Sequence, residues 1–190
     1  MPRLSLLRVA ALLLALMPAI SAAKTDKVEQ QRQEVRAMAR STIEDLYRLQ
    51  PKSRAALGSA AGYAVFRNFG LKIFVGGGGS GTGVAFDRSG QEVTYMKMAE
   101  GQAGLGLRAK KYRQVWVFEN RSDLERFINS GWELGAQTTL SAKLSGQGGS
   151  LFTGAMSVRP GVWLYQMSDD GLAVDLTVKG TKYYRNKALN

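Results

Sequence analysis

The stretch KIFVGGGGSGTGVAFD, residues 72–87, places Gly76, Gly78 and Gly81 in the spacing G-x-G-x-x-G. In a nucleotide-binding turn, this spacing follows a strand and opens a helix whose N-terminus holds the phosphate. A strand-like run precedes the glycines, but no apolar stripe of helical period follows Gly83. The stretch therefore predicts a glycine-lined bend between two antiparallel strands, open to another backbone, a lipid or a ligand. The ligand-facing residues would be Gly76, Gly77, Gly78, Gly79, Gly81 and Gly83.

The residues after Ala61 alternate between short apolar runs and turn residues, a pattern typical of antiparallel strands. VWVF, residues 115–118, is apolar on both faces and predicts a strand deep in the core. Glycines inside strand runs are typical of sheets that bend sharply or close into a barrel. The expected strands are residues 63–66, 72–75, 84–86, 92–98, 103–107, 114–119, 138–144, 161–167 and 173–179.

The first predicted helix covers residues 24–50, which lack Gly and Pro and place apolar side chains at helical spacing up to Pro51. A break near residues 40–42 and a short helical segment at 53–57 are also compatible with the pattern. The acidic residues on the polar face favour packing on the domain's own sheet over binding at a membrane surface.

A second helix is expected where Ser122 and Glu125 form a capping box. Its buried stripe would be Leu124, Phe127 and Ile128. The predicted fold class is α+β: a curved, mostly antiparallel or barrel-like sheet, with an N-terminal helix and one further helix packed on it.

The N-terminus, MPRLSLLRVAALLLALMPAISAA (residues 1–23), has the layout of a secretory signal: basic residues, an apolar run, then small residues. The apolar run is too short to span a bilayer, which takes about 20 residues. We expect cleavage after Ala23 and export to the periplasm or cell envelope. The exported chain would contain a helical segment at residues 24–57 and a glycine-rich β-domain at 58–190, folded as one unit.

The composition excludes several kinds of chemistry, because the 190 residues include no histidine and no cysteine. Histidine-based catalytic triads, disulfides and the common zinc sites therefore cannot form. A hydrolase that pairs Ser80 with Lys72 stays open, although the G-x-S-x-G motif of a nucleophile elbow is missing. We expect a protein without catalytic activity, metal or cofactor.

The charge balance points to polyanions, with 26 basic residues, 15 acidic residues and a formal net charge of +11. An exported protein meets little nucleic acid, whereas anionic phospholipids and other anionic lipids are part of a cell envelope. A basic surface that only keeps the protein soluble is equally compatible with this charge.

Several ordered blocks resemble the SYLF domain, a lipid-binding family also called DUF500, over about residues 29–185. The resemblance implies phospholipid binding: phosphoinositides in eukaryotic members and anionic lipids in exported bacterial ones. Arg67 and Lys72 depart from the residues common in the family and add charge beside the glycines. The blocks are A-x-G-x-A-V-F at 60–66, G-x-G-V at 81–84, EGQAGL at 100–105, VFEN-x-x-x-L-E-R-F at 117–127 and the tail tyrosines Tyr183 and Tyr184.

We therefore expect an exported, non-catalytic, peripheral phospholipid-binding protein that docks on anionic membrane surfaces. Tyr112 and Trp116 are expected at the membrane interface, where a ring can face lipid and its polar edge water. The expected head-group contacts are Arg67 and Lys72 beside the glycines, and Arg108, Lys110, Lys111 and Arg113 of the segment RAKKYR.

Two alternatives stay open at the level of sequence. The segment RAKKYR is also compatible with a solvated loop in front of a buried strand. The whole chain is compatible with a cell-envelope scaffold, in which the helix at residues 24–50 and exposed strand edges recruit protein partners and lipid contact is incidental.

Overall fold

A computed structural model describes the backbone of residues 3–73, 76–88, 93–103, 108–134, 150–168, 171–172 and 180–190. Within these ranges, side chains are described except at residues 3–24, 69–73, 76–77, 102–103, 108–110, 133–134 and 150. No helix in this part of the chain is long and apolar enough to cross a membrane.

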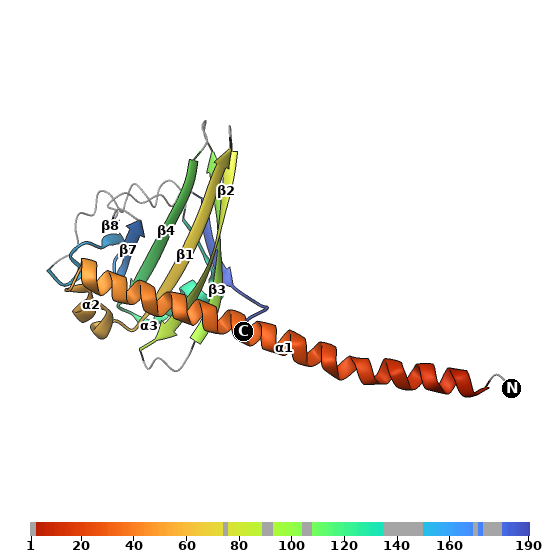
Figure 1. Cartoon of the computed structure of the whole chain (residues 1–190). Helices are drawn as coiled ribbons and strands as arrows, with labels where there is room; N and C mark the ends of the chain where they lie inside the picture. Colours follow the sequence, from red (N-terminus) through yellow and green to blue (C-terminus); the bar gives the residue numbers. More distant parts are fainter. Residues whose placement is uncertain are drawn as a thin grey trace.

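The core of the fold is one curled sheet whose described strand pairs are all antiparallel (Figure 1). The strands follow the order β5-β9-β3-β2-β1-β4-β7-β6, with β8 beside β7. Together with the helices on it, the sheet confirms the predicted α+β fold class. The strands are β1 (Gly62–Ile73), β2 (Gly76–Asp87), β3 (Val93–Ala103), β4 (Arg108–Phe118), β5 (Trp132–Leu134), β6 (Met156–Arg159), β7 (Val162–Ser168), β8 (Gly171–Leu172) and β9 (Thr181–Arg185).

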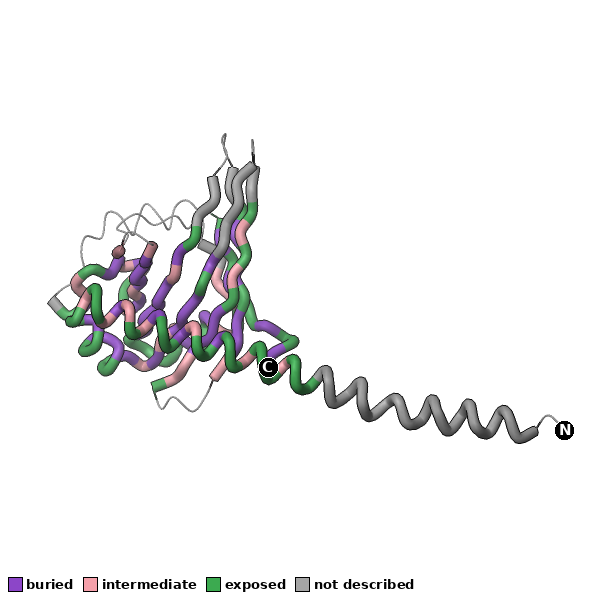
Figure 2. The backbone as a smooth tube through the Cα atoms, in the orientation of Figure 1, coloured by how far each residue is buried: buried purple, intermediate pink, exposed green. Residues whose placement is uncertain are grey.

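The C-terminal half of the helix α1 (Arg3–Leu49) lies across one face of the sheet, and α2 (Ser53–Ser59) follows it. Val35, Ala39 and Leu46 are buried against the sheet, which confirms that the predicted amphipathic helix packs on its own domain. The helix continues through residues 40–42 without the predicted break. Figure 2 shows more buried and more exposed positions alternating along residues 25–49 of this helix, as expected when one side faces the core.

The opposite face of the sheet packs against α3 (Arg121–Ser130) around an aromatic cluster. The Phe127 ring lies at the centre, 5.6 Å from Trp116 and 5.4 Å from Tyr183 between ring centroids. The predicted capping box was wrong, because the N-cap of α3 is Asn120, two residues before Ser122. A short 3-10 helix, η1 (Ser150–Phe152), precedes β6.

The glycine-rich stretch is itself a strand, which corrects the predicted bend. Residues 76–87 of β2 pair residue by residue with β1 on one side and, up to Phe86, with β3 on the other. A Cβ on Gly83 would lie 2.2 Å from the Phe66 ring, and a Cβ on Gly81 would lie 2.6 Å from the Met98 side chain. The space beside these two glycines is therefore filled by neighbouring core side chains.

Several predicted strands are longer or shorter in the structure. The runs at 63–66 and 72–75 belong to one strand up to Ile73, while Ala103 ends β3 instead of opening a new strand. The strand at 115–118 is fully buried, as predicted. The runs predicted at 138–144 and 173–179 lie outside the described residues.

Candidate anion-binding face

Antiparallel pairing places five side chains in one row across the sheet, because residues directly opposite each other share a face. Arg67 of β1 lies opposite both Thr82 of β2 and Arg113 of β4. Thr82 lies opposite Lys97 of β3, which in turn lies opposite Tyr184 of β9. Four polar or charged side chains and one tyrosine therefore form a continuous row across β9, β3, β2, β1 and β4.

The next row on the same face, two residues further along each strand, adds two more cations. Lys111 of β4 lies opposite residue 69 of β1, and Ser80 of β2 also lies opposite that residue. Ser80 lies opposite Ala99, which lies opposite Lys182 of β9. We call the exposed cations of both rows the basic face: Arg67, Lys97, Lys111 and Lys182.

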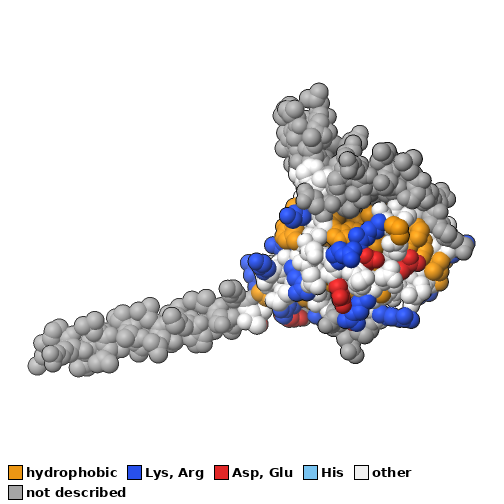
Figure 3. All heavy atoms as spheres, turned by 180° about the vertical axis from the view of Figure 1, so that it is seen from behind, with side chains coloured by type: hydrophobic (Ala, Val, Ile, Leu, Met, Phe, Trp, Pro, Cys, Tyr) orange, Lys and Arg blue, Asp and Glu red, His pale blue; other side chains and the backbone are white. Residues whose placement is uncertain are grey.

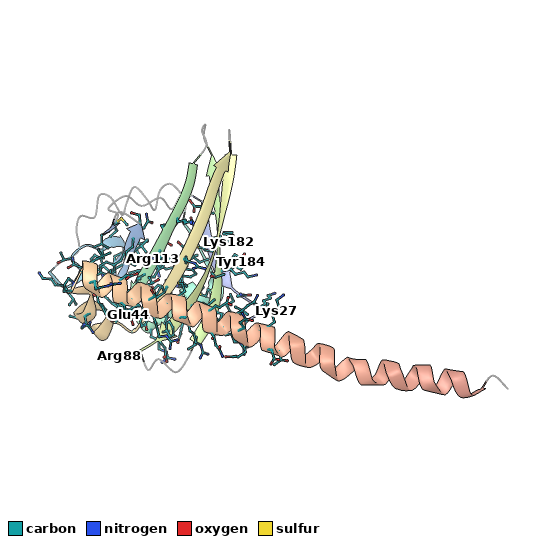
Figure 4. All side chains as sticks on the ribbon, viewed as in Figure 1. Lys27, Glu44, Arg88, Arg113, Lys182 and Tyr184 are labelled. Carbon is teal, nitrogen blue, oxygen red and sulfur yellow. The ribbon has the colours of Figure 1, made fainter. Side chains whose placement is uncertain are left out.

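The basic face begins where α1 stops covering the sheet. Val65, Val84 and Val115 lie on the same face one row earlier and are buried beneath the helix. In Figure 4, Lys182 and Tyr184 lie above α1 as drawn, on the part of the sheet that the helix leaves open. On this face, the row of Arg67, Thr82 and Lys97 is exposed, whereas the row beneath the helix is buried.

A shallow depression of about 690 Å³ lies on this part of the molecule. Cationic groups and small hydroxyl side chains both border it, a combination suited to oxyanions, because hydroxyls and ammonium or guanidinium groups all donate hydrogen bonds. The charged and hydroxyl-bearing residues at its wall are Arg67, Lys97, Lys111, Arg113, Ser80, Thr82, Tyr112, Ser168 and Tyr184.

The basic face differs from the opposite side of the molecule in how its charges are paired. No carboxylate of the described residues forms an ion pair with Arg67, Lys97 or Lys182. Around α3, cations and carboxylates are interspersed, as Figure 3 shows, and Asp123 pairs with Arg159. The charges of Arg67, Lys97 and Lys182 are therefore available to an external anion.

Arg113 lies at the edge of the basic face but contacts the protein itself. Its guanidinium donates to Asp45 of α1, which also accepts from Arg48. The hydrogen bond from Arg113 holds the pKa of Asp45 below its usual value of 3.8, and the Arg48 contact adds to this effect. Arg113 therefore fixes α1 to the sheet, a role that the sequence did not predict.

The structure brings together only part of the predicted head-group site. Arg67 and Lys111 both belong to the basic face, although they lie on different strands. Lys72 pairs with Arg108 through the backbone, and Lys110 pairs with Gly70. The side chains of Lys72, Arg108 and Lys110 lie outside the described residues.

The two aromatic residues predicted at the membrane interface, Tyr112 and Trp116, are buried, with 2% and 0% of their surface exposed. Both belong to the core cluster on the α3 side of the sheet. The alternation of β4 explains the error: RAKKYR is strand and not loop, so neighbouring side chains point to opposite faces.

Tyr112 belongs to a buried polar cluster inside the curled sheet. Its hydroxyl donates to Glu100 Oε2 at 2.6 Å, and Asn68 Nδ2 donates to the same oxygen at 2.7 Å. Burial, followed by the bond to Glu100, raises the pKa of Tyr112 far above its usual value. Nearby, the Tyr183 hydroxyl donates to Gln114 at 2.7 Å. These bonds satisfy polar groups that would otherwise be costly to bury.

The sequence interpretation missed Lys97 and Lys182, which complete the basic face on the far side of β2. Each is a single cation between apolar or small residues, so neither stands out as a charge cluster. The available signal is the strand period, because Lys182 and Tyr184 alternate with the buried Thr181 and Tyr183. That period indicates an exposed face but not which strand lies beside it.

A comparison with curated proteins finds a relative over most of the chain. Beta cell expansion factor A of Aeromonas veronii is 31% identical over 158 residues, which cover 82% of this chain. The matched segment is 57% of that protein, so this chain spans little more than half of its length. No protein-family model matches the chain.

Proposed function

We propose that this protein is an exported, non-catalytic protein that binds anionic phospholipid surfaces through the basic face. The observation that carries the proposal is the gathering of four exposed cations from β1, β3, β4 and β9 on one uncovered face. Three of them have no carboxylate partner among the described residues. The SYLF-like sequence blocks and the signal-like N-terminus support the proposal independently.

The expected affinity follows from the number of cations. Each lysine or arginine near an anionic membrane surface contributes about 1 kcal/mol at low salt. Four such groups contribute about 4 kcal/mol, or roughly a thousandfold in binding constant. Salt weakens this interaction, since the Debye length falls to about 8 Å at physiological ionic strength.

The alternative function, a scaffold that recruits partners through the N-terminal helix, has less support from the packing. The apolar stripe of α1 is occupied by the protein's own sheet, with Ala39 and Leu46 almost fully buried. A partner helix could not use this stripe without displacing α1.

Co-sedimentation of the purified protein with vesicles tests the proposal. We expect pelleting with vesicles that contain phosphatidylglycerol, little with pure phosphatidylcholine, and loss of binding as salt rises. A Lys97→Glu/Lys182→Glu double variant should lose most of this binding. The control is Lys52→Glu/Lys187→Glu, which changes the net charge equally at two exposed lysines outside the basic face. If both double variants lost the same amount of vesicle binding, the binding would depend on total charge alone. That result would contradict the proposal that the basic face is the binding site.

A further inference from the structure

A second group of arginines borders a cleft of about 630 Å³ that shares no lining residue with the depression beside the basic face. The cleft lies between α1, the start of β3, α3 and the segment that follows β9. Its charged residues are Arg32, Arg36, Arg121 and Arg185, with the carboxylates Asp87 and Glu125.

Tyr95 holds the two arginines of α1 in position. Its ring is buried, and its hydroxyl accepts a 2.5 Å hydrogen bond from Arg36 Nε. The guanidinium carbons of Arg32 and Arg36 lie 5.9 and 5.7 Å from the ring centroid, within the range of cation–π attraction. The cleft therefore holds these arginines before any ligand arrives, which lowers the entropy lost on binding.

The side chain of Asn190 fixes Tyr95 in turn. Its Nδ2 donates to the carbonyl of Tyr95 at 2.8 Å, while its Oδ1 accepts from the backbone N–H of Tyr95 at 3.0 Å. The last residue of β3 that pairs with β9 on this side is Met96. The two bonds from Asn190 hold the backbone of the next residue, Tyr95, in the same way. Asn190 therefore fixes the backbone of Tyr95 where this residue lines the cleft.

Arg36 and Arg185 keep hydrogen-bond donors for a ligand. A guanidinium has five N–H groups, and Arg36 uses only Nε among the described residues. The side chain of Arg185 is exposed and donates no hydrogen bond to a described residue. Arg121, by contrast, pairs with Glu125 at 2.8 Å.

We propose that this cleft binds a phosphate monoester, with Arg36 and Arg185 as its main contacts. The lining side chains, four arginines and two carboxylates, carry a net charge of +2, and a phosphate monoester carries about −1.5 to −2 at pH 7. All four cations are arginine, whose planar fork matches phosphate oxygens in pairs. The site is separate from the basic face and does not depend on the proposed membrane docking.

Isothermal titration calorimetry of the purified protein with sn-glycerol 3-phosphate, at constant ionic strength, tests the site. Arg36→Gln and Arg185→Gln should each weaken binding at least tenfold. Arg40→Gln is the matched control, because Arg40 is exposed one turn further along α1 and does not border the cleft. Should Arg36→Gln unfold the protein by losing Tyr95, Arg185→Gln decides, since Arg185 is exposed.

A second arm separates a soluble phosphate from a lipid head group. Vesicles containing phosphatidic acid present the same monoester, and binding that Arg185→Gln weakens more than Arg40→Gln identifies a lipid source. Binding to glycerol phosphate without binding to these vesicles identifies a soluble phosphate as the ligand. Lys97→Glu/Lys182→Glu should leave the glycerol phosphate titration unchanged, so failure of the membrane proposal would not remove this site. No response to either probe, or equal weakening by Arg40→Gln, would overturn it.

Discussion

Arg113 of β4 forms an ion pair with Asp45 of α1, and this contact ties the N-terminal helix to the sheet beside the basic face. Their side chains are 29% and 20% exposed, so water only partly screens the pair. The pair lies at the boundary between the covered part of the sheet and the basic face. It therefore connects the stability of the fold to the shape of the candidate lipid-binding surface.

Replacing Asp45 with Asn should lower the melting temperature at pH 7 by about 2–4 °C, the equivalent of about 1 kcal/mol. The pKa of Asp45 lies below 3.8 in the folded protein, so its charge stabilises the fold above that value. This contribution is lost as the pH falls through the lowered pKa. Calorimetric melting of both proteins between pH 6 and pH 3 should show their difference shrinking at the acid end. Glu44→Gln, at an exposed neighbour without a described ion pair, should cause little change at any pH.

Gly83→Ala should destabilise the protein by about 1–3 kcal/mol, because the new methyl group would overlap the Phe66 ring and the Val65 carbonyl oxygen. Gly78→Ala on the same strand should be neutral or slightly stabilising. Its Cβ would meet only the Glu100 carbonyl oxygen at 3.5 Å, and alanine reduces the entropy of the unfolded chain. Chemical denaturation of the two variants measures the difference. Equal losses would mean that strand propensity, and not packing against Phe66, explains the glycines.

The period of the apolar residues was sufficient to predict the α+β class, the packing side of α1 and the fully buried centre of β4. The site was harder, because it depends on which strands lie side by side. Lys97 and Lys182 lie far apart in sequence and reach one face only through the pairing of β3 with β9. The segment RAKKYR was interpreted as one basic cluster because the sequence does not show that it is a strand. In the strand β4, the neighbouring side chains of Lys111 and Tyr112 point to opposite faces of the sheet.

The glycine-rich stretch shows why local propensity failed. Glycine is unfavourable in strands, so its density indicated a bend. In the structure, the neighbours of Gly81 and Gly83 fill the space that side chains would occupy. That close approach comes from Phe66 on β1 and Met98 on β3, and no pattern within β2 itself reveals it.

Tyr165→Phe should leave stability at pH 7 unchanged or raise it, because the buried hydroxyl of Tyr165 has no hydrogen-bond partner among the described residues. Burial raises the pKa of Tyr165 to about 12, so its neutral form stabilises the fold fully below pH 10. That contribution is lost as the pH rises toward 12, where ionisation favours unfolding. The variant should therefore lose less stability between pH 9 and pH 11, as followed by thermal melting.

Tyr112→Phe provides the opposite test of a buried hydroxyl. This variant removes a donor to Glu100 and should cost about 1–3 kcal/mol at pH 7. If both phenylalanine variants changed stability in the same direction, the hydrogen-bond assignment of the interior cluster would be wrong.

Thr82→Glu tests the basic face without removing any of its cations. Thr82 lies between Arg67 and Lys97 in one row, so a carboxylate there would pair with cations on both neighbouring strands. Cross-strand pairs of opposite charge contribute roughly 0.2–1 kcal/mol, so the variant should fold at least as well as the parent. Its binding to phosphatidylglycerol vesicles should nevertheless fall at least tenfold, because the new charge competes with the lipid phosphates. Thr82→Gln, of nearly the same shape but neutral, should bind as the parent does. Undiminished binding by Thr82→Glu in co-sedimentation would place the lipid contact elsewhere on the protein.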